Sequence, residues 1–172
     1  MEGFKAVSPS DIEKSAVRLI GSDWMLISAE KDGKINMMTA SWGGLGVLWN
    51  KPVAFVFIRP QRYTYEFTEA GDEVTLSFFG DGYRDMLRKM GTVSGRDQNK
   101  LALSGLTYDL SVPHSPVPLE ADTVLRGRKL YADFIKRDSF VSDDVRADAY
   151  PGEDYHRVYV YEITEALVRQ AR

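Results

Sequence analysis

Two blocks of polar residues in the first 64 positions carry side chains that could hold an anion. The first, residues 36–43 with the sequence NMMTASWG, ends an extended segment and runs into glycines. The second, residues 59–64 with the sequence RPQRYT, leaves an apolar segment through a proline. Hydroxyls, backbone N–H groups and arginines are suitable partners for phosphate. We therefore expect the two blocks to form halves of one site for an anion and an aromatic ring.

The segment between the blocks indicates how they are positioned. Residues 53–58, VAFVFI, are β-branched or aromatic, and Pro52 introduces them, which is typical of a short buried strand. The other predicted strands cover residues 24–30, 34–40, 73–79, 106–112 and 155–163, with a hairpin of 121–125 and 129–136 around Gly127. Asp32-Gly33 predicts a two-residue turn between the first two strands, because both positions of that turn need positive φ.

Helices are expected between the strands. Residues 10–13, SDIE, form a capping box that predicts an N-terminal helix to about residue 19, within an N-terminal region of residues 1–20. A second helix should cover 63–70, with Thr64 as its N-cap and Gly71 as its end. Further helices are expected at 83–90 and 98–103, whereas the acidic residues 143–154 read as an exposed loop.

The order of these elements favours one domain, residues 1–172, that is mainly β. Roughly seven strands follow one another through tight turns, and three or four short helices are inserted between them. This order is typical of an antiparallel β-barrel or sandwich with α insertions, and it disfavours a doubly wound parallel sheet.

Composition excludes several classes of function. The net charge of −3 disfavours a nucleic-acid partner, and no apolar run approaches the length of a membrane helix. The chain has no cysteine and only two histidines, which excludes thiolate chemistry and disfavours a transition-metal site. Together with the absence of a signal-peptide pattern, this composition leads us to expect a cytoplasmic protein.

Local motifs for nucleotide binding and hydrolysis are missing. The sequence contains no G-x-G-x-x-G after a strand, no G-x-x-x-x-G-K-[ST], no H-E-x-x-H and no G-x-S-x-G. A Rossmann site and a hydrolase are therefore not supported.

Two further blocks complete a pattern. Residues 94–101 read SGRDQNKL, and residues 154–163 read DYHRVYVYEI. In order and spacing, the four blocks resemble the flavin reductase-like group of FMN-binding split-barrel proteins, which includes flavoredoxin, over about residues 20–165. The resemblance implies a Greek-key split β-barrel that forms a homodimer, with one FMN per subunit near the interface.

The resemblance also implies the residues around the cofactor. They are Asn36, Met38, Thr39, Ala40, Ser41, Trp42, Arg59, Pro60, Gln61, Arg62, Tyr63, Thr64, Ser94, Gly95, Arg96 and Lys100. The residue types agree with this assignment, because a phosphate dianion suits arginines and hydroxyls, while a flavin ring suits an apolar or aromatic wall.

The implied function is that of a flavin reductase, in which NAD(P)H passes hydride to FMN and an unknown acceptor takes the electrons. Because flavin chemistry resides on the cofactor, no catalytic side chain is required. Two alternatives remain open: a flavoredoxin-like electron carrier or flavin-binding module without nicotinamide activity, and a split barrel that has lost flavin.

Ordinary structural roles compete with these assignments. Arg59 and Arg62 could be surface arginines, and Trp42 is favoured as a packing residue over a ring-stacking one. His156 is expected at the surface or an interface, and His114 in an exposed loop. The acidic residues of 143–154 are spaced too widely for a calcium site.

Overall fold

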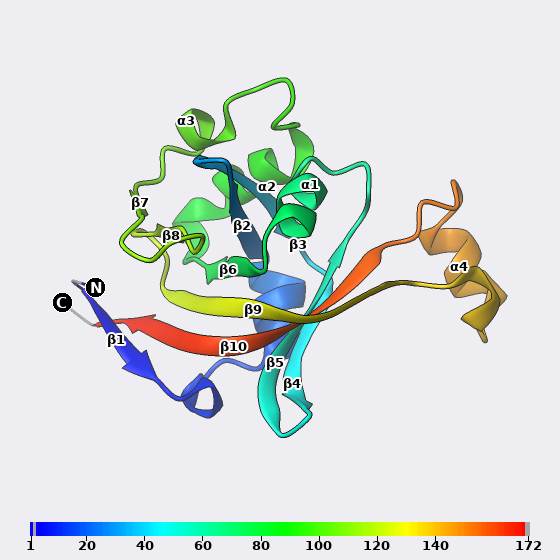
Figure 1. The fold of residues 1–172 in the computed structure, drawn as a ribbon, viewed down its shortest axis with the longest axis horizontal. Coiled ribbons are helices and arrows are strands. Elements are labelled where there is room, and N and C mark those ends of the chain that lie inside the picture. The colour runs from blue at the N-terminus through cyan, green and yellow to red at the C-terminus, as the bar shows by residue number, and fades with distance from the viewer. Residues whose placement is uncertain (2, 171–172) are drawn as a thin grey trace.

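The computed structural model describes residue 1 and residues 3–170, in which strands dominate (Figure 1). The strands are β1 (Phe4–Val7), β2 (Met25–Lys31), β3 (Lys34–Ala40), β4 (Gly43–Leu48), β5 (Lys51–Ile58), β6 (Glu73–Phe78), β7 (Tyr108–Asp109), β8 (Val117–Pro118), β9 (Thr123–Phe134) and β10 (Arg157–Arg169). The α-helices are α1 (Thr64–Ala70), α2 (Arg84–Thr92), α3 (Lys100–Ser104) and α4 (Asp143–Ala149). Short 3₁₀ turns η1 (Pro9–Asp11), η3 (Asp81–Tyr83) and η4 (Arg137–Ser139), and a π-helical segment η2 (Arg18–Asp23), complete the set.

One antiparallel sheet forms the body of the molecule, in the order β3-β2-β6-β9-β10-β5-β4, with β1 also paired to β10. The strand β10 pairs with β9 along most of its length, with β5 near its beginning and with β1 near its end. Helices α2 and α3 pack on the face of β2 and β3 that carries Leu26 and Met37, whereas Phe67 of α1 packs on the opposite face with Ile27 and Met38. Helix α4 lies on an extension beyond β9 and β10 (Figure 1). The predicted mainly β fold with α insertions is confirmed.

Two hydrophobic clusters hold the sheet and helices together. Inside the bent sheet, Ile27, Val56, Leu76, Leu125 and Tyr159 are almost completely inaccessible to solvent. Burial of apolar side chains at this density supplies most of the favourable free energy of folding.

The second cluster lies beneath α2 and α3. It joins Leu26 and Met37 of the sheet to Leu87 and Met90 of α2. Because successive residues of a strand point to opposite faces, the neighbours Leu26 and Ile27 enter different clusters, and β2 is buried on both sides.

Two tight turns fix the hairpins that lead to the polar blocks. Asp32 and Gly33 have φ values of 51° and 72°, which confirms the predicted turn between β2 and β3. A second such turn joins β4 to β5 at Trp49 and Asn50, with φ values of 53° and 57°. Its sequence lacks glycine, and β4, which is rich in glycine, was not predicted as a strand.

The predicted hairpin around Gly127 is wrong, because β9 runs without a turn from Thr123 to Phe134. Gly127 serves close packing: a Cβ atom there would lie 2.9 Å from Cβ of Tyr161 and 3.2 Å from a methyl group of Val74. Glycine in an apolar segment marks either a turn or a close approach, and here it marks the latter.

Helix boundaries differ from prediction at both ends of the chain. The capping box at residues 10–13 starts no helix; Ser8 caps the single turn η1, and the next helical segment begins at residue 16. The acidic region expected to be a loop contains α4, capped by the Ser142 hydroxyl. Acidic residues in its first turn favour this helix through the helix dipole.

Other boundaries moved for identifiable reasons. Thr64 is not an N-cap, because Tyr63 occupies that position and the buried Thr64 hydroxyl accepts a hydrogen bond from Asn36. The last strand extends to Arg169, where β1 pairs with it, and β1 itself was not predicted. Of the predicted strand at 106–112, only β7 forms.

We predict that Gly127→Ala lowers the free energy of unfolding by about 1–3 kcal/mol, because the new methyl group overpacks the contact with Tyr161. Urea denaturation measures the change. Gly82→Ala is the matched control, since a Cβ there meets nothing within 4 Å. Equal stability of the two variants would contradict the packing role of Gly127.

Candidate functional site

The ends of β3, β5 and β10 meet at a cleft of about 270 Å³. Antiparallel pairing places Arg157 of β10 opposite Ile58 of β5, so the residues next to this pair face the same opening. The lining residues are Met38, Thr39, Ala40, Ser41, Trp42, Phe57, Arg59, Arg62 and His156. The two polar blocks therefore converge, as the sequence indicated.

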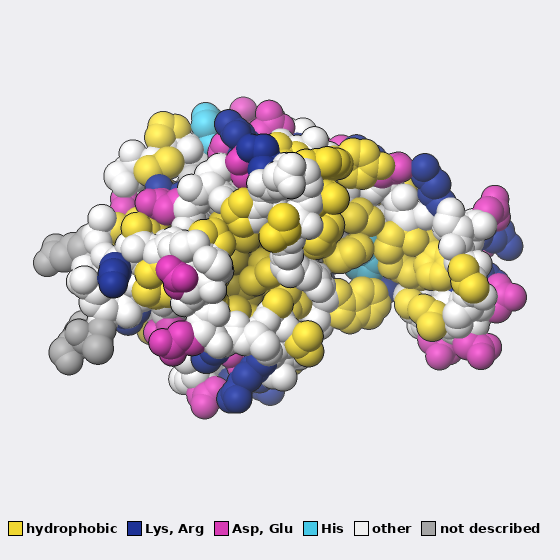
Figure 2. All heavy atoms as spheres, turned by 90° about the horizontal axis from the view of Figure 1, so that it is seen from below, with side chains coloured by type: hydrophobic (Ala, Val, Ile, Leu, Met, Phe, Trp, Pro, Cys, Tyr) yellow, Lys and Arg dark blue, Asp and Glu magenta, His cyan; other side chains and the backbone are white. Residues whose placement is uncertain are grey.

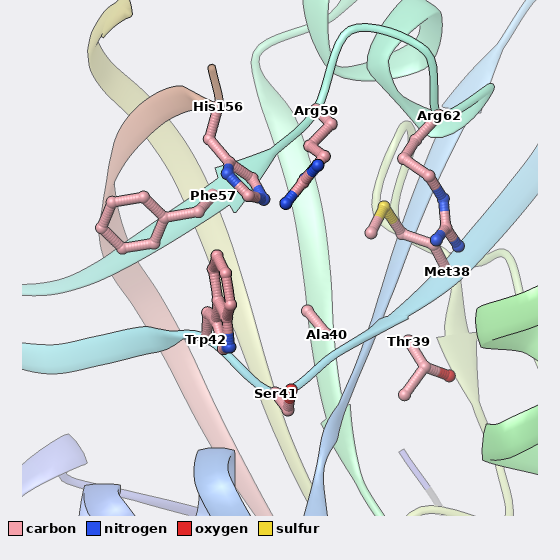
Figure 3. A pocket seen from close by; sticks show the side chains of 9 residues that line it. All are labelled: Met38, Thr39, Ala40, Ser41, Trp42, Phe57, Arg59, Arg62 and His156. Carbon is pink, nitrogen blue, oxygen red and sulfur yellow. The ribbon is translucent and has the colours of Figure 1, made fainter. Parts of the chain in front are cut away.

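One wall of the cleft is aromatic. The rings of Trp42 and His156 have centroids 5.2 Å apart, and Phe57 lies edge-on to His156 at 6.4 Å. Figure 3 shows these three side chains together, across the opening from Arg62 and Thr39. Trp42 is 49% exposed, so the core position considered from sequence is wrong, whereas the interface packing stays a prediction. In this chain its ring is available to a ligand.

His156 is 7% exposed, so the surface position predicted as one alternative is wrong, and the other alternative, a position at an interface, stays a prediction. The Tyr150 hydroxyl lies 2.8 Å from its Nδ1 atom. Burial, and then the nearby charge of Arg59, lower the pKa of His156 to about 4. The imidazole is therefore neutral at physiological pH, and it contributes a polar but uncharged edge to the aromatic wall.

Arg59 already has partners of its own. Its guanidinium forms an ion pair with Asp154, donates to the Ala149 carbonyl at 2.8 Å and lies over the Tyr150 ring. The Gln61 amide also donates to Asp154, at 2.5 Å. Arg59 thus fastens the α4 extension to the rim of the cleft, with Asp154 as its counterion.

A smaller cavity of about 130 Å³ adjoins the cleft. Its lining residues are Asn36, Gln61, Arg62, Tyr63, Thr64, Thr92, Val93, Ser94, Gly95 and Lys100. Gly95 is required here, since a Cβ would overlap the Asn36 amide and lie 2.8 Å from the Tyr63 ring. The 94–95 backbone can therefore approach both side chains closely.

Arg62 connects the two spaces, because it lines both. Its Nη2 atom is inaccessible to solvent and has no hydrogen-bond partner among the described residues, and burial lowers the pKa of the group. A buried guanidinium nitrogen without a hydrogen-bond partner is costly, so this Nη2 atom is poised for a ligand acceptor.

Lys100 supplies a second cation to the smaller cavity. The side chain is 4% exposed, and its ammonium donates to the Met90 carbonyl at 2.7 Å. Burial, and then the charge of Arg62, lower the pKa of Lys100 to about 8. Two cationic groups therefore share a cavity whose described lining contains no carboxylate.

Comparison with known proteins identifies the family of this chain. A family model described as the flavin reductase like domain matches residues 17–171. The chain belongs to the flavin reductase-like family. Among the curated proteins, none matches the sequence.

Solved structures of flavin reductase-like proteins share the fold. An FMN-binding domain of a flavin reductases-like enzyme from Shewanella baltica OS155 is 19% identical, with a TM-score of 0.69 over 96% of this chain and 77% of that one. Flavoredoxin of Desulfovibrio vulgaris (Miyazaki F) is also 19% identical, with a TM-score of 0.67 over 95% and 78%. A protein with a split barrel domain from Shewanella frigidimarina NCIMB 400 is 15% identical, with a TM-score of 0.66 over 88% and 71%. The sheet described above is thus the split barrel of this family.

Most residues that the sequence assigned to the site line one of the two spaces. Pro60 and Arg96 do not. Arg96 closes the smaller cavity from outside: it donates to the Gln61 carbonyl at 2.9 Å, pairs with Glu66 at 2.6 Å and lies over the Tyr63 ring.

Four lining residues were not predicted: Phe57, Thr92, Val93 and His156. Phe57 could have been found, because alternation along β5 places it on the same face as Arg59. Within residues 3–170, no helix is long and apolar enough to cross a bilayer.

Proposed function

We propose that this flavin reductase-like protein binds FMN, with the ring in the cleft and the phosphate in the smaller cavity, and acts as an NAD(P)H-dependent oxidoreductase. Bound FMN would accept hydride from the nicotinamide and release electrons to an acceptor. The names of similar structures support the cofactor, since they include an FMN-binding domain and flavoredoxins.

The observation that carries the proposal is the position of Arg62. Its guanidinium, whose Nη2 atom has no partner among the described residues, borders two connected spaces of different chemistry, one with an aromatic wall and one with a second cation. A phosphorylated flavin has the same division, because a flat ring and a dianion are joined by a flexible chain. A ligand with only one of these parts would leave the other space without a matching group.

Each part of the site has a distinct task toward such a ligand. Trp42 and His156 offer an aromatic surface against which a ring can pack. Thr64 and Ser94 border the smaller cavity with hydroxyls, and Arg62 and Lys100 border it with positive charge. Neutral His156 adds no charge beside the ring, so the positive charge is concentrated at the phosphate end.

Similarity to flavoredoxin favours a second candidate function, an FMN electron carrier without nicotinamide activity. The two candidates need the same binding site, and they differ in whether the open side of the cleft admits a nicotinamide. In the absence of a Rossmann motif, nicotinamide would dock transiently against the bound flavin.

We also propose that the protein acts as a homodimer. Large apolar side chains remain exposed around the β4–β5 hairpin, notably Val47, Trp49 and Tyr131, and Trp49 packs edge-on against Tyr131. Figure 2 shows hydrophobic side chains across the middle of the face that carries this hairpin. The edge strand β4 pairs only with β5 among the described strands and has no charged residue, which is typical of an edge that a partner covers.

We predict that Arg62→Ala weakens FMN binding by about 1.5–3 kcal/mol, the scale of a lost charge-assisted hydrogen bond, which corresponds to about 10- to 150-fold in Kd. Quenching of flavin fluorescence on titration with apo-protein measures the affinity. Arg88→Ala is the matched control, because Arg88 is an exposed arginine of α2. Unchanged affinity in Arg62→Ala would remove Arg62 from the site.

We predict that the purified protein, loaded with FMN, shows flavin absorbance that bleaches when NADH or NADPH is added without oxygen. Bleaching identifies a reductase. A flavin that stays oxidised with both nicotinamides but is reduced by dithionite identifies the carrier. Protein that takes up no FMN would refute both functions.

We predict that sedimentation equilibrium gives about twice the chain mass of 19.4 kDa and that Trp49→Glu gives the monomer, since a buried charge would oppose association. Leu110→Glu tests an exposed apolar residue elsewhere, near β7, and should remain dimeric. A monomeric native protein would contradict the proposed dimer.

A further inference from the structure

Two cationic side chains, Arg62 and Lys100, line the smaller cavity, and they differ in how readily they lose a proton. Arg62 keeps its charge at all physiological pH values, because a guanidinium does not lose its proton in proteins. Lys100 is different, since an ammonium can shed its proton when it is buried. Lys100 is 4% exposed, and among the described residues its ammonium donates a single hydrogen bond, to the Met90 carbonyl.

The surroundings of Lys100 leave its charge uncompensated. Helix α3 packs against β3 and α2. The charged residues of these two elements do not compensate the charge of Lys100. Arg84 stacks on Trp24, and the exposed ones are Lys34, Asp85, Arg88 and Lys89. Glu66 is paired with Arg96, and Asp97 is exposed. Within the cavity, Tyr63 contributes a neutral phenol and Arg62 a like charge.

We propose that Lys100 makes this site selective for a phosphate monoester over unphosphorylated flavin, and that it does so by taking up a proton when the phosphate binds. The inference rests on the proposed function for its natural ligand, but the cavity that carries it is defined by this chain's own residues. A dianion placed between Arg62 and Lys100 compensates both charges, so the protonated lysine is stabilised in the complex.

The sign of the pH dependence follows from linkage. In the free protein, burial and Arg62 depress the pKa of Lys100 to about 8, so most molecules carry the proton at pH 7 and few do at pH 9.5. A bound dianion raises this pKa, and the complex retains the proton. The affinity for FMN is therefore at its maximum well below pH 8, and well above pH 8 it falls by about tenfold per pH unit. The reason is that only protein with protonated Lys100 binds the dianion.

The same argument distinguishes the contribution of the phosphate to binding from the contribution of the flavin ring. Riboflavin has the ring and sugar chain of FMN but no phosphate, so it places no dianion near Lys100. Any ionisation of the ring at high pH is common to both flavins and cancels in the comparison. The pH-dependent part of the affinity should therefore be present with FMN and absent with riboflavin.

The test is titration of the apo-protein with FMN and with riboflavin from pH 7 to 9.5, followed by fluorescence quenching. We expect FMN affinity to fall about 30-fold over this range, while riboflavin affinity stays within about twofold. Isothermal titration calorimetry at pH 8 in two buffers of different ionisation enthalpy should show uptake of about half a proton with FMN.

Variants assign the effect to Lys100. Lys100→Met should bind FMN weakly and without the pH dependence, and Lys100→Arg should bind FMN without the pH dependence, because arginine stays charged. Lys89→Met, which changes an exposed lysine of α2, should behave as the native protein. Circular dichroism verifies that each variant is folded, and Lys100→Arg preserves a decisive comparison if Lys100→Met does not fold.

Some outcomes would overturn the inference while leaving the proposed function intact. These are identical pH profiles for FMN and riboflavin, or a full pH dependence retained in Lys100→Arg. If neither flavin binds at any pH, the proposed function fails, and inorganic phosphate becomes the probe. Phosphate binding with proton uptake that Lys100→Arg abolishes would still support the inference, and absence of such binding would overturn it.

Discussion

The pairing of β10 with three other strands is the constraint on which the rest of the structure depends. Its 13 residues hydrogen-bond to β9, then to β5 at one end and β1 at the other. Two register shifts against β9 bend the pair, so the sheet can curve around the core. The antiparallel pairing of β10 with β5 places the start of β10 beside the end of β5, and with it Phe57, Arg59 and His156 at one opening.

The two arginines of the second polar block lie in different electrostatic environments. Arg59 is paired with Asp154 and connects the extension to the rim, whereas Arg62, three residues later, is partly buried and has a buried Nη2 atom without a partner among the described residues. The turn between them separates these environments: the Arg62 N–H donates to the Arg59 carbonyl at 3.0 Å. Residue type alone does not distinguish the two roles. They depend on the direction in which each side chain extends from the turn.

The parts of the fold that could be predicted from sequence are those with local causes. The Asp32-Gly33 turn follows from backbone preferences, and the buried strand before Arg59 follows from composition. Convergence of the two polar blocks could be argued because both lie at strand ends. These features need only the properties of neighbouring residues.

Features with distant causes could not be predicted in this way. Gly127 lies in a continuous strand because Tyr161 packs on it, and the two residues are 34 positions apart. The burial of His156 depends on Tyr150, on the α4 extension and on Trp42. The hairpin of β4 and β5 turns at Trp49 and Asn50 without glycine, so its local signal is weak.

The α4 extension shares its attachment points with the wall of the cleft. Arg59 and His156 line the opening, and they also bind Asp154 and Tyr150 at the base of the extension. Exposed residues of α4 away from this base, such as Asp143 and Asp144, can therefore vary during evolution without altering the cleft. A family member could acquire a longer or differently charged projection there, and so a new partner, while its ring-binding surface stays the same.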